Sequence, residues 1–189
     1  GGQRFALAGH SCSELALRAI SNGLGQPRDQ VGHLREQTGP GGLGAALHGE
    51  QVRVFASTDA DMLGAFTMNY VEEAAGIALA ARAAHMPLAL SFTLETDGRL
   101  PSGISLAEAI KRVEQVSAAH PAYYMINCAH PTHFEHMLDT LGPLKKRVRG
   151  LRANASTRSH AELDACTTLD IGDPAELGEQ YASLRDQLP

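Results

Sequence analysis

The sequence contains no tryptophan, and aromatic residues make up only 5% of its 189 residues. Proteins that bind single-stranded nucleic acid stack bases on aromatic side chains, so this composition argues against that class of function. The net charge of −5 also disfavours nucleic acid and anionic membrane surfaces, which attract basic proteins. The one basic cluster, residues 145–149, is interpreted as a solvated helix end followed by a strand. We therefore expect neither nucleic acid nor a membrane as a partner.

Cysteine is also scarce. Cys12, Cys128 and Cys166 are too few and too far apart for a disulfide framework. No apolar run approaches the roughly 18 residues of a transmembrane helix, and the N-terminus lacks the pattern of a secretory signal. The sequence has no CxxC, P-loop, GxSxG or glycine-rich dinucleotide motif. These absences predict a cytoplasmic protein without the nucleotide and hydrolase sites that such motifs build.

From residue 46 onward, apolar strand-like runs alternate with helix-like segments. Strands are expected over residues 61–68, 87–94, 123–128 and 148–153, and helices over 46–58, 71–84, 106–119, 131–141, 161–165 and 174–188. A capping box of Ser105 and Glu108, and prolines at positions 131 and 174, mark helix starts. The strands are almost continuously apolar, which is typical of a parallel sheet with covered faces in an α/β fold.

The first 45 residues differ from the rest. They are rich in glycine and polar residues, and only Ser13 to Ile20 indicates a helix. We expect no strand of comparable quality there and a loosely ordered segment over residues 1–45, followed by an α/β domain over residues 46–189. A closed eight-stranded barrel typically needs about 250 residues, so four good strand–helix units predict an open sheet or a partial barrel.

A polar residue or a thiol stands at the end of each of the four predicted strands or directly after it. Thr67, Glu95, Cys128 and Asn154 occupy these positions. The carboxyl ends of parallel strands share one edge, and α/β proteins build their sites there. Each residue alone is more commonly a cap, a turn residue or, for cysteine, a small buried hydrophobic group. Together they predict a rim at which Glu95 could hold a substrate ammonium and Cys128 could be a metal ligand or nucleophile.

Histidines recur every third residue after Cys128, at His130, His133 and His136. On a helix they would lie near one another, and His130 could join Cys128 on one metal or serve it as a base. No third group that would orient such a pair can be identified. We favour the ordinary interpretation, in which these histidines cap or coat the start of a helix.

Four segments resemble the homocysteine S-methyltransferase family, the zinc-thiolate enzymes that include the betaine-dependent type. They are TMNYVEEA at 67–74, SFTLETDGRLPSG at 91–103, MINCAHP at 125–131, and GLRANAS followed by SHAELD at 150–164. The resemblance covers residues 48–189. It implies a (β/α)8 TIM-type barrel, of which these four to five units look like the middle part, the fourth to seventh.

The resemblance also implies a chemistry. Cys128 aligns with one of the family's three zinc ligands, and we predict Thr67, Glu95 and Asn154 as substrate-binding residues. The implied reaction, a step of methionine biosynthesis, moves a methyl group from an onium donor, such as betaine or a sulfonium, to a thiol whose pKa zinc lowers. The expected partners are therefore a small-molecule thiol and a methyl donor.

The sequence departs from this family in three ways. The family's other zinc ligands form a Cys-Cys pair, which is absent here, and its first strands are missing or replaced by the unmatched N-terminal residues. Phe66 stands where many members carry the glutamate that holds the substrate amino group, so the acceptor stays open. The sequence does not indicate which methyl donor is used. These departures predict a truncated, incomplete enzyme. The alternative is a non-catalytic binding or assembly module built from a half barrel, which self-associates or takes a partner chain.

Overall fold

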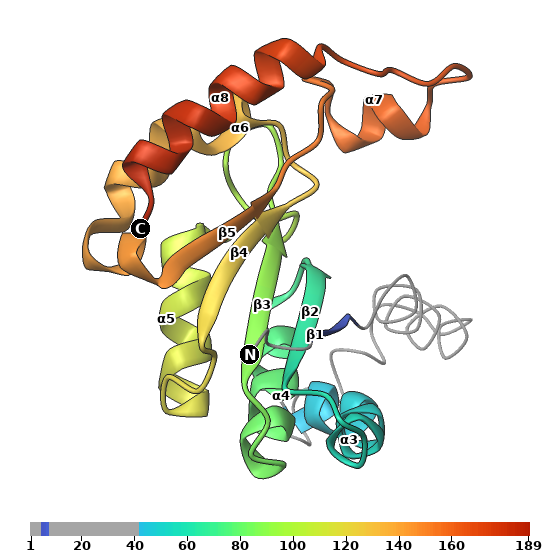
Figure 1. Ribbon diagram of the computed structural model, residues 1–189, viewed down its shortest axis with the longest axis vertical. Coiled ribbons are helices and arrows are strands. Elements are labelled where there is room, and N and C mark those ends of the chain that lie inside the picture. Colours follow the sequence, from blue (N-terminus) through green and yellow to red (C-terminus); the bar gives the residue numbers. More distant parts are fainter. Residues whose placement is uncertain (1–4, 8–41) are drawn as a thin grey trace.

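The computed structural model describes residues 5–7 and 42–189. They form one parallel five-stranded sheet whose strand order is β1-β2-β3-β4-β5, so each strand lies beside the one that precedes it in the chain (Figure 1). The strands are β1 (Phe5–Leu7), β2 (Met62–Met68), β3 (Leu88–Thr93), β4 (Tyr123–Asn127) and β5 (Val148–Arg152). Sequential parallel neighbours are the arrangement found in a barrel of strand–helix units.

Helices follow most of these strands. They are α3 (Gly42–Ala56), α4 (Val71–Ala83), α5 (Leu106–Ser117), α6 (Pro131–Phe134), the 3₁₀ helix η1 (Glu135–Arg147), α7 (His160–Asp164) and α8 (Pro174–Gln187). α3 packs against α4, α4 against α5, and α5 against η1, so these helices form a row on one face of the sheet (Figure 1). The chain is therefore an α/β partial barrel, and the predicted fold class is confirmed.

The core lies between the sheet and this row of helices. All six residues of β3 are buried, and Phe92 in this strand stacks on Tyr124 of β4 with ring centroids 6.2 Å apart. The alanines on the buried side of α4 have small side chains, so this helix can lie close to α3 and α5 as well as to the sheet. The Ala-rich composition of this helix thus reflects close packing on several sides rather than helix propensity alone.

The opposite face of the sheet is less covered within the described residues. In β2, Leu63 and Ala65 are buried, whereas Gly64 and Phe66, which alternate with them, are half-buried. The same alternation in β4 leaves Met125 half-buried. Within the described residues, the expectation of strands covered on both faces therefore holds for β3 and is wrong for β2, β4 and β5.

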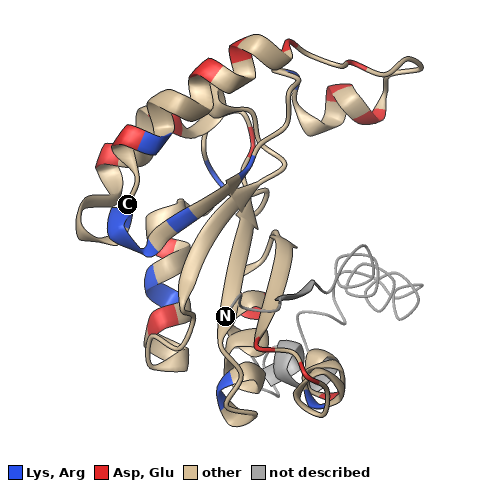
Figure 2. Cartoon of the chain, viewed as in Figure 1, with Lys and Arg blue, Asp and Glu red and all other residues tan. Residues whose placement is uncertain are grey.

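Charged residues lie mainly on the helices and loops, and β2, β3 and β4 carry none (Figure 2). The basic cluster at residues 145–149 is the end of η1 followed by the start of β5, as the sequence predicted. Arg147 fixes this end because its guanidinium donates to Glu114 at 2.7 Å and lies 5.6 Å from the centre of the Tyr124 ring.

Two predicted helix features differ in the structure. The segment expected as one helix over 131–141 is α6 followed by the first part of the 3₁₀ helix η1. The helical geometry is interrupted at Gly142 (φ 53°) and Pro143, just beyond the predicted end. Proline has no N–H to continue a helical ladder. At the start of α5, Ser105 accepts from the Glu108 N–H, but the Glu108 carboxylate pairs with Arg112 instead of closing the predicted capping box.

The N-terminal prediction was also incomplete. Phe5–Leu7 pair in parallel with Met62–Gly64, although no strand was expected in this part of the sequence. Three residues are too short a run to stand out from their neighbours. The predicted helix Ser13–Ile20 lies outside the described residues. Among the helices that the structure does describe, none has the length and apolar character required to cross a membrane.

We expect Phe92→Ala to lower the free energy of unfolding by about 3–5 kcal/mol, because this change empties a fully buried site at the centre of the sheet. Val54→Ala is the control, since Val54 is 56% exposed and its loss should stay within about 0.5 kcal/mol. Urea denaturation measures both values. A loss for Phe92→Ala no greater than that of the control would contradict the central role of the β3–β4 packing.

Candidate functional site

The buried side chain of Asn127, at the end of β4, ties three strand ends together. Its Oδ1 accepts from the Thr67 N–H at 3.0 Å and from Ser91 Oγ at 2.5 Å. Its Nδ2 lies 3.0 Å from Thr67 Oγ1 and 3.4 Å from Thr93 Oγ1. One amide thereby holds the carboxyl ends of β2, β3 and β4 at a single point.

Cys128 follows Asn127 and is held by both its side chain and its main chain. Its half-buried Sγ accepts from Asn127 Nδ2 at 3.0 Å. Its N–H donates to the Arg152 carbonyl of β5 at 3.0 Å. Its carbonyl accepts from His160 Nε2 at 2.6 Å and from Asn154 Nδ2 at 3.1 Å. The thiol therefore lies at the rim of the sheet, beside the segment that follows β5.

Two residues at this rim have left-handed backbone conformations. Thr67 has a φ of 62° and Cys128 a φ of 56°. This region is uncommon for residues other than glycine, and a β-branched threonine there is an outlier. Such strain persists where surrounding contacts impose it, and it clusters at functional sites. Asn127 contacts both residues, so the strain and the hydrogen-bond network coincide.

His160, the first residue of α7, bridges two strand ends. Its Nε2 meets the Cys128 carbonyl, and its Nδ1 lies 3.1 Å from Glu95 Oε1. Burial by itself lowers the pKa of His160, but the Cys128 carbonyl and the Glu95 carboxylate outweigh it, so the pKa is raised above 6.5. Because both ring nitrogens face acceptor oxygens, the imidazolium, which has two N–H donors, satisfies both contacts.

The histidines that follow Cys128 serve the helix and the neighbouring loop. His130 Nδ1 accepts from the Thr132 N–H and caps α6, and His133 Nε2 binds the Thr157 carbonyl at 2.8 Å. Burial, and next the proximity of His133, lower the pKa of His130. His136 is exposed. These contacts agree with the favoured capping interpretation.

The alternative pair of Cys128 as nucleophile and His130 as base, which the sequence analysis did not favour, shows no hydrogen bond in this structure. The Sγ atom is bound by Asn127, and His130 Nδ1 is occupied by Thr132. The two side chains therefore belong to separate hydrogen-bonded groups.

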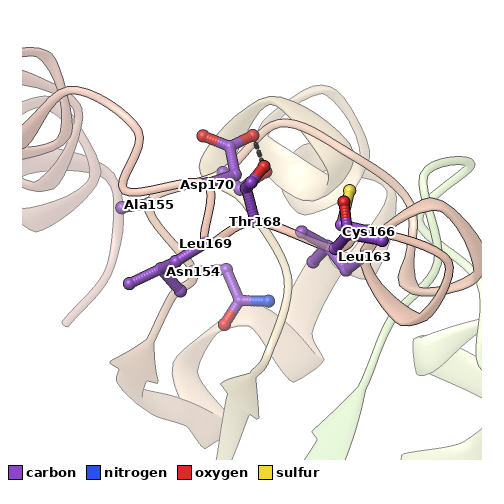
Figure 3. Close-up of a pocket in the computed structure, with 9 residues that line it drawn as sticks. Asn154, Ala155, Leu163, Cys166, Thr168, Leu169 and Asp170 are labelled. Atoms are coloured by element: carbon purple, nitrogen blue, oxygen red, sulfur yellow. Dashed lines mark hydrogen bonds between the residues drawn. The ribbon is translucent and has the colours of Figure 1, made fainter.

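An open cavity of about 510 Å³ lies beside this rim. It is lined by residues 154–156, Leu163 and residues 166–170, all of which follow β5 (Figure 3). Ser156 Oγ donates to Asp170 at 2.8 Å, and this bond, followed by that from the Gly172 N–H, lowers the pKa of Asp170. The Asn154 side chain connects the cavity to the rim, because it lines the cavity and donates to the Cys128 carbonyl.

Within residues 5–7 and 42–189, no group of three or more histidine, cysteine or acidic side chains is arranged to hold a metal ion. Cys128 supplies a sulfur donor of the type that suits zinc, but a catalytic zinc usually has three protein ligands. Cys12 lies outside the described residues. The part of the chain that the structure describes therefore does not by itself fit the zinc site that the resemblance implies.

The model of the homocysteine S-methyltransferase family matches residues 44–186. The chain belongs to this family. The prediction made from the four sequence segments is thereby confirmed. A search of curated proteins gave no match.

The rim residues predicted from sequence belong to one hydrogen-bonded network in this homocysteine S-methyltransferase domain. Asn127 joins Thr67 to Cys128, and His160 joins Cys128 to Glu95. Neither connecting residue was among the site residues predicted from sequence. Asn127 could have been predicted from sequence, since it is the one amide in an otherwise apolar strand. His160 lies 65 residues from Glu95, and no local pattern indicates their contact.

We expect His160→Gln to destabilise the domain more at about pH 5.5 than at about pH 8.5. The folded pKa of His160 is raised above 6.5, so its stabilising contribution is fully present below pH 6.5 and is lost as the pH rises through the folded value. Urea denaturation of both proteins across this range measures the difference.

The matched control is the same substitution in a Glu95→Gln background. The pH dependence of the His160→Gln effect should be smaller there, because the acceptor charge has been removed. An effect of equal size at both pH values in the wild-type background would contradict a charged contact between His160 and Glu95.

Proposed function

We propose that this domain is an S-methyltransferase that moves a methyl group from an onium donor to a small-molecule thiol of the homocysteine type. The family match supports this class of reaction. At the level of residues, the Asn127–Cys128 junction carries the proposal. A thiol with a strained backbone, held by an amide N–H at the carboxyl ends of the strands, has the position and the restraint expected of a reaction centre.

The rim offers charged groups for a substrate that resembles an amino acid. The side chains of Glu95 and His160 are 35% and 30% exposed, so each can meet a ligand while remaining in contact with the other. In this proposal Glu95 binds the substrate ammonium and His160 lies close enough to bind its carboxylate. Thr67 and Asn154 complete the substrate-binding set, and the cavity beside Asn154 accommodates the rest of a small molecule.

Phe66 gives Glu95 a particular importance in this proposal. The family's substrate-binding glutamate is replaced here by an aromatic ring, which folds back along β2 so that a Cβ at Gly64 would lie 3.0 Å from it. An apolar ring cannot bind an ammonium as a carboxylate does. Glu95, at the end of the neighbouring strand, is then the rim carboxylate that takes this role.

Zinc is the proposed cofactor, with Cys128 as one of its ligands. The described residues fit zinc in the type of donor and not in the number of donors. We therefore propose that the remaining ligands come from outside the residues that the structure describes.

We expect purified protein to contain stoichiometric zinc that is lost in Cys128→Ser and retained in Cys166→Ser. Methyl transfer from betaine or a methylated sulfonium to homocysteine and other thiols should be abolished by the first change and kept by the second. Elemental analysis and product detection by mass spectrometry measure the two properties. A protein with neither zinc nor methyl transfer would overturn the proposal. Zinc retained in Cys128→Ser would remove Cys128 from the ligand set.

A second candidate function is an assembly module, and the half-buried side chains on the sheet face opposite the helices favour it. Phe66 and Met125 lie on this face. A second copy or a partner chain would cover them. Sedimentation equilibrium should then show a dimer that Met125→Lys dissociates, with circular dichroism confirming that the variant is folded. A monomer at every concentration would contradict self-association.

A further inference from the structure

The side chain of Asn127 is fully used by contacts within the chain. It is 2% exposed, and its amide has five neighbouring polar atoms, two at Oδ1 and three at Nδ2. An amide offers two N–H donors and two acceptor lone pairs, so these neighbours saturate it. The amide has no donor or acceptor left for a substrate, so the role of Asn127 lies in the groups to which it is hydrogen-bonded.

The orientation of this amide follows from one of its partners. The Thr67 main-chain N–H can only donate, so the Asn127 atom 3.0 Å from it must be the acceptor Oδ1. The opposite atom is then Nδ2, which points its hydrogens at Cys128 Sγ and Thr67 Oγ1. The Cys128 sulfur therefore faces the N–H donor of Asn127. The direction of this donor is fixed by the contact with Thr67 of β2, which lies two positions from β4 in the sheet.

The strained residues give independent support. Thr67 and Cys128 both have positive φ, and each is hydrogen-bonded to the Asn127 side chain. Surrounding contacts must impose such conformations, since the backbone alone disfavours them. Asn127 is the residue that contacts both, so the strain at the two strand ends depends on the same amide that reaches the sulfur.

We propose that Asn127 is the positioning residue of the Cys128 thiol: its Nδ2 orients Sγ, and its remaining hydrogen bonds anchor that donor to β2 and β3. The inference rests on the proposed function only in taking Cys128 as the reacting or ligating group. It assigns Asn127 to the sulfur and not to a substrate.

Asn127→Asp isolates the contact with the sulfur from the anchoring contacts. The carboxylate keeps an acceptor for the Thr67 N–H and for Ser91 Oγ. The hydroxyls of Thr67 and Thr93 accept from Asn127 in the wild type and can rotate to donate to the second carboxylate oxygen. Only the sulfur loses its donor without replacement, and the new negative charge repels the electron pair with which sulfur attacks.

The test is the rate at which iodoacetamide alkylates Cys128 relative to Cys166, followed by peptide mass spectrometry on folded protein freed of metal by a chelator. We expect the ratio to fall about tenfold or more in Asn127→Asp, as for the loss of a hydrogen bond to a charged acceptor. Thr93→Val is the matched control, because it removes an anchoring contact of Asn127 and leaves the sulfur contact in place. Its ratio should be unchanged.

A purely structural role for Asn127 predicts the opposite result. Loosening the strand ends would expose Cys128, so the ratio would rise in both variants in proportion to their loss of stability. An unchanged or increased ratio in Asn127→Asp would overturn the inference.

A second measurement covers the case in which Asn127→Asp does not fold. The side-chain amide protons of Asn127, observed by NMR in ¹⁵N-labelled protein, should shift in Cys128→Ala and stay in place in Cys166→Ala. Absence of a shift in Cys128→Ala would show that sulfur is not the partner of Nδ2.

Both measurements omit substrate and metal, so a failed methyl-transfer assay leaves them valid. Conversely, if the wild-type protein transfers methyl groups and the alkylation ratio is unchanged in Asn127→Asp, this inference is wrong and the proposed function stands.

Discussion

The hydrogen bonds of the buried Asn127 amide determine how the strand ends of this domain fit together. A buried amide is costly unless each of its polar atoms finds a partner, and the partners here come from two neighbouring strands, β2 and β3, and from Cys128. Because side chains alternate between the faces of a strand, a slip of one residue in β2 or β3 would turn those partners away. The network thus favours one register of the sheet and, with it, one arrangement of the rim.

The segment after β5 is attached to this rim by polar contacts. α7 has no buried residue, so hydrophobic packing does not fix its place. His160 bonds to the Cys128 carbonyl and to Glu95, and the Thr157 carbonyl bonds to His133. The cavity beside Asn154 is bounded by the same segment. The shape of the cavity therefore depends on a few hydrogen bonds to the strand ends. A change in the charge of His160 or Glu95 would alter these bonds and, with them, the volume of the cavity.

Local sequence patterns predicted much of the fold, because apolar runs, helix caps and prolines act over a few residues. They failed where the signal was short, as in the three residues of β1, and where the helix expected over 131–141 divides into α6 and the 3₁₀ helix η1. The four rim positions followed from the strand ends. The residues that connect them did not, since Asn127 and Thr67 are 60 positions apart and their contact is a property of the folded sheet. Backbone strain at Thr67 and Cys128 has the same non-local origin.

Because of the contacts of the Cys128 carbonyl, the anchoring of the segment after β5 does not depend on which side chain stands at position 128. His160 and Asn154 both bind the main chain at this position, and every amino acid supplies that same carbonyl. The side chain can therefore change while the following segment keeps its anchor. Only the left-handed conformation restricts the choice, toward residues such as glycine, asparagine and aspartate that tolerate it. A scaffold of this kind can exchange the side chain at position 128 during evolution without rebuilding the segment that is anchored to it.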